Sequence, residues 1–228
     1  WGKNSQGQCG LNHVDDVIRP VVCSLSTKTQ KVINLAAGWE HSMALTADGS
    51  IYSWGCGYKD SRRGVIPPVL GLGSNECKLR PERIKSLGDI CITQVVCGWD
   101  HCLALSDQGN VYSWGSGQNG KLGNGSEENV SIPTMIEISP SIRIVNISAG
   151  CEHSAAISSM GDLFTWGHGD GGRLGHGDNA AYPKPTNVLS IGAMSVIPIS
   201  IHCGDKFTTI IAQSKAIFDT GCFKKKKK

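Results

Sequence analysis

The run WGSGQNGKLG at residues 114–123 returns as WGHGDGGRLG at residues 166–175 and, in a variant form, as WGKNSQGQCG at residues 1–10. A fourth Trp-Gly pair begins at Trp54, so the pairs stand at residues 1, 54, 114 and 166, with steps of 53, 60 and 52 residues. Repeats of this length are typical of architectures in which one small unit stacks on the next. The chain is therefore predicted to contain about four copies of one unit.

A second marker, Gly-x-x-His, stands 16 residues before a Trp in three copies. Its glycines are Gly38, Gly98 and Gly150, and its histidines are His41, His101 and His153. A decayed fourth marker begins at Gly204, where Phe207 replaces the histidine. A proline follows the Trp by 19 residues in three copies but by 27 after Trp54, so the second copy contains an eight-residue insertion.

Each marker is followed by two alternating apolar segments around a turn dipeptide, as in His41 to Trp54 around Asp48-Gly49. This pattern predicts a β-hairpin. A third strand is expected just before each marker and a fourth near the proline, for example at Pro20 and Pro133. Four short strands per copy, with little helical periodicity, favour an all-β propeller of four-stranded antiparallel blades and exclude an α-solenoid.

The constant residues are interpreted as structural. A blade cannot bury both apolar faces alone, so a large indole is expected to fill the space between neighbours at Trp1, Trp54, Trp114 and Trp166. The marker glycines, Gly204 included, are expected to allow a close backbone approach or an unusual dihedral. The marker histidines are expected to hydrogen-bond one strand to another rather than to act on a substrate.

The repeated W-G-x-G-x-x-G-x-L-G pattern resembles the regulator of chromosome condensation repeat family, whose members form seven-bladed β-propellers. The resemblance covers residues 1–223, with copies of 52–60 residues, and residues 224–228 are interpreted as a poly-lysine tail. It implies a partial propeller of about four of the seven blades. We expect the remaining blades in a longer chain. We also expect the isolated arc to aggregate, to dimerise or to be marginally stable, because the apolar faces of its outer blades and its unpaired strand edges are exposed to solvent.

The charge balance does not indicate nucleic acid or chromatin as a partner. The net charge of +3 comes from 22 basic and 19 acidic residues, and five of the basic residues are the terminal lysines. The repeats alone are near neutral. No apolar stretch approaches the roughly 18 residues that a transmembrane helix needs, so no integral membrane segment is expected.

The ten cysteines show no C-x-x-C pair with a histidine at zinc-finger spacing. We interpret them as free buried thiols in a reducing compartment, cytoplasmic or nuclear, and expect no metal and no cofactor. Two G-x-G-x-x-G runs begin at Gly115 and Gly167, but the Gly-Asn-Gly and Gly-His-Gly segments after them cannot start the helix that a dinucleotide site requires. The acid–His pairs occur three times, which is unlike a single active site, so no catalytic residue is predicted.

The insertion after Trp54 is the one element that breaks the repeat. It joins an aromatic, a cationic pair and an apolar tip stiffened by Pro67 and Pro68, a combination that suits an interaction site on a loop; a tolerated solvent loop is the alternative. The partner-binding candidates are Tyr58, Lys59, Asp60, Arg62, Arg63, Val65 and Ile66.

The family resemblance implies three functions. The first is a protein–protein interaction module, recognising a small GTPase or the substrate of a HECT-type ubiquitin ligase. The second is a guanine-nucleotide exchange factor for a Ran-like GTPase, since the insertion looks similar to the wedge that the Ran exchange factor inserts into its partner. The third is the plant UV-B photoreceptor, whose Gly-Trp-Arg-His motifs have counterparts at Trp39 and Trp99; here Glu40 and Asp100 replace the arginines and Cys151 a third Trp, which disfavours it.

Overall fold

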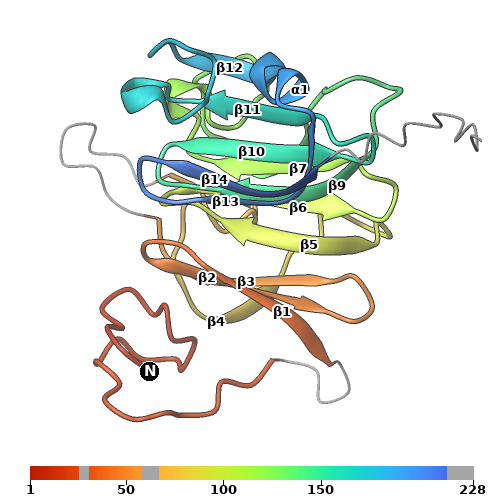
Figure 1. The fold of residues 1–228 in the computed structure, drawn as a ribbon. Helices are drawn as coiled ribbons and strands as arrows, with labels where there is room; N and C mark the ends of the chain where they lie inside the picture. Colours follow the sequence, from red (N-terminus) through yellow and green to blue (C-terminus); the bar gives the residue numbers. More distant parts are fainter. Residues whose placement is uncertain (26–30, 58–66, 215–228) are drawn as a thin grey trace, which may run out of the picture.

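A computed structural model of the protein describes residues 1–25, 31–57 and 67–214 (Figure 1). These residues form three four-stranded antiparallel sheets and one two-stranded sheet. In chain order, the strands are β1 Val32–Ala37, β2 His41–Thr46, β3 Ile51–Gly55 and β4 Lys78–Arg83; β5 Ile92–Cys97, β6 His101–Ser106, β7 Val111–Gly115 and β8 Val130–Met135; β9 Ile144–Ala149, β10 His153–Ser158, β11 Leu163–Gly167 and β12 Tyr182–Asn187; β13 Val196–Cys203 and β14 Thr208–Ser214.

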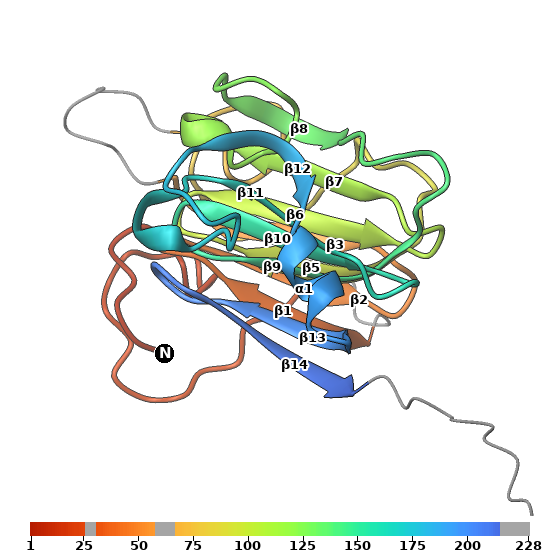
Figure 2. The same ribbon diagram turned by 45° about the horizontal axis from the view of Figure 1, so that its top comes forward.

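Each four-stranded sheet joins three strands that end at a Trp-Gly pair with an outermost strand that follows this pair in the chain. The strand orders β1-β2-β3-β4, β5-β6-β7-β8 and β9-β10-β11-β12 are simple up-and-down meanders. The first strands of successive sheets contact one another, β1 with β5, β5 with β9 and β9 with β13, so the sheets are arranged as the blades of an arc, seen from two directions in Figures 1 and 2. The predicted all-β fold with four-stranded antiparallel blades is confirmed.

The predicted hairpins and most of the outer strands are present. The prolines of three copies, Pro81, Pro133 and Pro185, lie within β4, β8 and β12, each the outermost strand of its sheet, where a residue without an N–H is tolerated. The expected strand near Pro20 is wrong, because residues 20–23 form no strand. The N-terminal segment instead makes only an isolated bridge between Gly2 and Val17.

The two central strands of each complete blade are the most enclosed part of the fold. β6 and β10 are buried along their whole length, because neighbouring blades cover both faces of their sheets. Met43 and Leu45 of the first blade pack with Val95 and Trp114 of the second, and Leu103 and Leu105 of the second pack with Ile147 and Trp166 of the third. The apolar core therefore lies between blades and not within them.

Helical structure is minor. It comprises α1, Leu189–Ala193, and two single 3-10 turns, η1 Gln118–Gly120 and η2 Asp170–Gly172, inside the W-G-x-G-x-x-G-x-L-G runs. Within the described residues, no helix combines the length and the apolar character that crossing a membrane needs.

Candidate functional site

The Gly-x-x-His marker forms a repeated link between blades. His101 Nε2 lies 2.9 Å from Ser154 Oγ of the next blade, and His153 Nε2 lies 2.9 Å from Thr208 Oγ1. Each hydroxyl donates onward to a backbone carbonyl, of Lys121 and of Arg173, so each imidazole must donate through Nε2–H. In the first link, the partner of His41 Nε2 is a thiol, Cys102 Sγ, at 3.1 Å.

The marker position must be glycine because the histidine ring packs directly against it. A Cβ on Gly98 would lie 2.2 Å from His101 Cε1 and 2.5 Å from the carbonyl oxygen of Gly150. The four marker glycines do not have the positive φ that favours glycine, so close approach, and not an unusual dihedral, explains them. Gly204 is packed in the same way against the Phe207 ring, which replaces the imidazole.

Burial keeps the imidazoles of His101 and His153 neutral. The pKa of His101 lies well below its ordinary value because the ring is desolvated and faces the cationic Lys121. Desolvation, with Arg173 nearby, lowers the pKa of His153 to about 4. Neutral rings that donate one hydrogen bond to a fixed acceptor are structural links and not proton carriers at neutral pH.

The Trp-Gly pair forms a second repeated link. The indole N–H groups of Trp54, Trp114 and Trp166 donate to the main-chain carbonyls of Gln8, Val69 and Lys121 at 2.9, 2.8 and 3.0 Å. Gln8 and Lys121 lie seven residues after the Trp of their own copy, whereas Val69 lies fifteen after Trp54. The eight-residue insertion is therefore accommodated before Val69, and the link is unchanged.

Trp1 does not share this environment. Its side chain is 76% exposed, so the expectation that it fills a space between blades is wrong.

A buried ion pair lies beside these links. Lys121, with 1% of its side chain exposed, places Nζ 2.6 Å from a carboxylate oxygen of Asp100. Its backbone carbonyl accepts from both Ser154 and Trp166. The ion pair thus ties the marker of the second blade to the W-G-x-G-x-x-G-x-L-G run that follows it.

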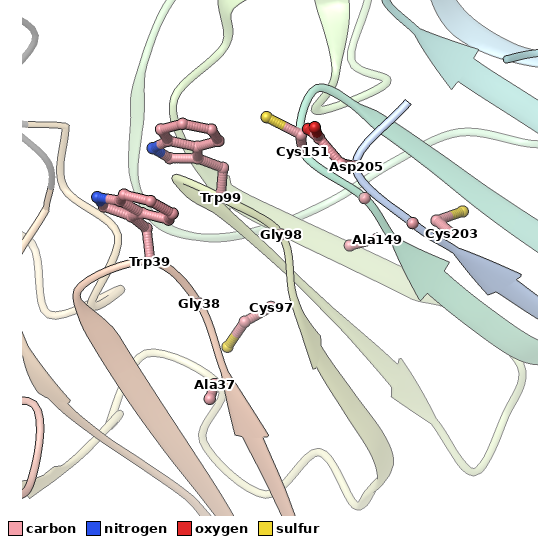
Figure 3. Close-up of a pocket in the computed structure, with 12 residues that line it drawn as sticks. Ala37, Gly38, Trp39, Cys97, Gly98, Trp99, Ala149, Cys151, Cys203 and Asp205 are labelled. Atoms are coloured by element: carbon pink, nitrogen blue, oxygen red, sulfur yellow. The ribbon is translucent and has the colours of Figure 1, made fainter. Parts of the chain in front are cut away.

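The markers enclose one recess, which we call the mouth. It occupies about 560 Å³ where β1, β5, β9 and β13 end (Figure 3). It is lined by the three-residue groups Ala37-Gly38-Trp39, Cys97-Gly98-Trp99, Ala149-Gly150-Cys151 and Cys203-Gly204-Asp205, one from each copy.

The chemistry of the mouth comes from the residue after each marker glycine. Trp39 and Trp99 stack with ring centroids 4.4 Å apart and an interplanar angle of 16°, and Trp39 is 54% exposed (Figure 3). Burial, together with a hydrogen bond to Asp205, raises the pKa of Cys151 to about 12. The mouth therefore offers an aromatic surface, one carboxylate and the thiols of Cys97, Cys151 and Cys203, of which that of Cys151 is protonated, and these groups suit recognition.

Beneath the mouth, three metal-ligand side chains converge. The ring of His41 and the thiols of Cys97 and Cys102 place their donor atoms within 4.8 Å of one another. Burial alone would raise the pKa of Cys97, but the hydrogen bond from Cys102 and the proximity of His41 lower it below its ordinary value. Burial, and then Cys97, raise the pKa of Cys102. The sequence showed no metal motif, yet the fold assembles a set of metal-ligand groups.

Two other cysteines correct the expectation of free thiols. Cys56 and Cys77, which flank the insertion, form a disulfide. Seven further cysteines of the described residues are free, Cys9, Cys23, Cys91, Cys97, Cys102, Cys151 and Cys203.

The partner-binding residues predicted in the insertion, 58–66, lie outside the described residues. Sequence reasoning missed the mouth as a site, although a signal was present. The position after the marker glycine is Trp39, Trp99, Cys151 and Asp205 in the four copies, so it varies where the residues around it repeat. A variable position inside a constant motif indicates a side chain that the fold does not constrain.

Comparison with known proteins identifies relatives of the whole arc. A family model described as an RCC1-like domain matches residues 1–226. The mouse E3 ubiquitin-protein ligase HERC2 is 35% identical over 223 residues, which are 97% of this chain and 4% of that protein. The Arabidopsis thaliana ultraviolet-B receptor UVR8 is 34% identical over 221 residues, which are 97% of this chain and 48% of that protein.

Among solved structures, Prp20p from Saccharomyces cerevisiae, whose binding to Gsp1p and histones has been described, superimposes with a TM-score of 0.74 at 23% identity. The match covers 94% of this chain and 51% of that one. The chain thus spans about half of Prp20p and UVR8 and a small part of HERC2.

Proposed function

Because this chain belongs to the family of RCC1-like domains, we propose that it acts as a protein-recognition module that binds its partner at the mouth. The observation that carries the proposal is the stacked pair of Trp39 and Trp99, held at the rim of an open recess. An exposed indole stacked on a half-buried one beside a pocket is the kind of aromatic anchor that dominates binding energy at protein interfaces.

The surrounding chemistry supports a protein partner over a small substrate. The main-chain N–H of Trp39 donates to the main-chain carbonyl of Trp99 at 3.2 Å. The backbones that carry the pair are therefore fixed to one another between blades, and the pair needs little ordering on binding. Asp205 adds a charge to the otherwise aromatic and thiol-lined recess, and this charge favours a partner with a basic group beside an apolar one.

Two partner classes are suggested by the relatives. The similarity to HERC2 supports recognition of a substrate for a ubiquitin ligase, and a HECT domain in the same reading frame would favour this role. The binding of Prp20p to Gsp1p supports a GTPase partner and the alternative role of a guanine-nucleotide exchange factor. An exchange factor needs no covalent step, because it binds the nucleotide-free GTPase more tightly than the loaded one.

The mouth is tested by replacing its aromatic pair. The intact protein and its Trp39→Ala/Trp99→Ala variant are compared for binding to a panel of purified small GTPases and to candidate ligase substrates. We expect binding to weaken at least tenfold, roughly 1.4 kcal/mol or more. Met160→Ala, which removes a side chain that is 80% exposed on the β10–β11 turn, is the control and should bind normally. Equal binding by all three proteins would reject the mouth.

The exchange-factor alternative is tested separately. Release of labelled GDP from each GTPase is followed with the parent protein and with Lys59→Ala, Asp60→Ala and Arg62→Ala. Faster release that these variants abolish would establish exchange. Unchanged release with the parent protein would reject exchange and leave the recognition module.

A further inference from the structure

We propose that His41, Cys97 and Cys102 form a zinc site that joins the first blade to the second. The three side chains come from β2, the end of β5 and the start of β6. Their donor atoms all lie within 4.8 Å of one another, and His41 and Cys102 are almost wholly buried. Thiolate and imidazole are the ligands that zinc prefers in proteins.

The geometry needs only small side-chain movements. Zn–S bonds of about 2.3 Å and Zn–N bonds of about 2.1 Å at tetrahedral angles place two sulfurs about 3.8 Å apart and a sulfur and a nitrogen about 3.6 Å apart. His41 Nε2 is 3.1 Å from Cys102 Sγ, and Cys97 faces Cys102 directly across the β5–β6 ladder. Cys97 also lines the mouth, so the fourth tetrahedral position can be reached by water.

Charge favours zinc over monovalent copper. Two thiolates and a neutral imidazole balance Zn²⁺, whereas Cu⁺ in the same site would leave a net negative charge in a buried position. Zinc binding would replace the single hydrogen bond of His41 with bonds from both blades to one ion, so the link would resist separation of the blades.

The neighbouring links show that both thiols are special to this position. The residue that accepts from the marker histidine is Cys102 here but Ser154 and Thr208 in the next two links. The residue before the marker glycine is Cys97 in this blade and Ala149 in the next. The last link has one thiol, Cys203, beside Thr208, so among the described residues only the first link combines two thiols with a histidine.

These links also supply the test variants. Cys97→Ala and Cys102→Ser each install the residue that the third blade uses at the same place, so the fold already accommodates both. The intact protein is reduced with a phosphine, stripped of metal and titrated with Zn²⁺ against a chromophoric chelator, and Co²⁺ is then used as a spectroscopic probe. Cys203→Ala is the matched control, because it removes the equivalent thiol from a link without a second one.

We expect one tightly bound Zn²⁺ per chain, a thiolate-to-cobalt charge-transfer band with Co²⁺ and a higher melting temperature with zinc. Cys97→Ala and Cys102→Ser should weaken binding by more than the 10–100-fold that loss of an outer-shell partner costs, and they should lose the band and the melting shift. Cys203→Ala should keep all three. Wild-type behaviour in both test variants, or a Cys97–Cys102 disulfide that persists in reductant, would overturn the proposal.

Discussion

The constant and the variable positions of the marker differ in burial and in task. Gly98 is packed so closely against His101 and the carbonyl of Gly150 that a Cβ has no room, and the imidazole of His101 is fixed by a hydroxyl of the next blade. One residue along, at Trp39 and Trp99, the side chains face the open mouth. The repeated residues of this chain hold the blades together, whereas the residues that vary between copies are left for a partner. Three measurements test this contrast.

The largest effect is expected for the indole between blades. Trp166→Ala removes a fully buried ring and its hydrogen bond to the carbonyl of Lys121, and it should lower the free energy of unfolding by about 4 kcal/mol. Trp1→Ala changes the same letter of the repeat at an exposed position and should alter stability by no more than about 0.5 kcal/mol. Urea denaturation of both variants measures this, and equal losses would show that position in the repeat, not burial, sets the cost.

Acid should weaken the histidine links. The folded pKa of His153 is about 4, below the ordinary value of 6.5, so the unfolded chain binds more protons between these values. Stability should therefore fall as the pH drops from about 6.5 to about 4, by about 3 kcal/mol for this residue, with a further contribution from His101. Denaturation across this range should give a shallower slope for His153→Gln. An identical slope would mean that this ring is not held neutral.

A smaller loss is expected at the marker glycine. Gly98→Ala forces a Cβ against His101 and the carbonyl of Gly150, and it should cost about 2 kcal/mol, since overpacked cores lose about 1–3. Gly192→Ala is the matched control, because a Cβ there meets nothing within 4 Å. Thermal unfolding distinguishes the two, and a neutral Gly98→Ala would remove close packing as the reason for the motif.

The fold could be predicted from the sequence because each blade is local. The hairpin of β2 and β3 and the proline of the outer strand beside it are near one another in the chain, so their spacing can be read from the sequence. The residues that pair between blades are far apart in sequence. His41 and Cys102 are separated by 61 residues, and the disulfide of Cys56 and Cys77 closes around an insertion that has no counterpart in the other copies.

The candidate site was harder to predict for the same reason. The mouth takes one short segment from each of four copies, and only the arc brings them together. No single residue type is common to all four copies at the position after the glycine, which is Trp in two copies, Cys in the third and Asp in the fourth. A search for recurring chemistry therefore passes over it, whereas a search for the positions at which copies disagree would find it.

The acceptor of each indole N–H is a main-chain carbonyl, which residues of different types can supply. The three residues that supply it have unrelated side chains, Gln8, Val69 and Lys121. The segment before Val69 is eight residues longer than the others, yet the hydrogen bond is kept. An array built this way can lengthen the segments before these anchors while the links between blades stay unchanged. Such segments are natural places to graft foreign recognition sequences.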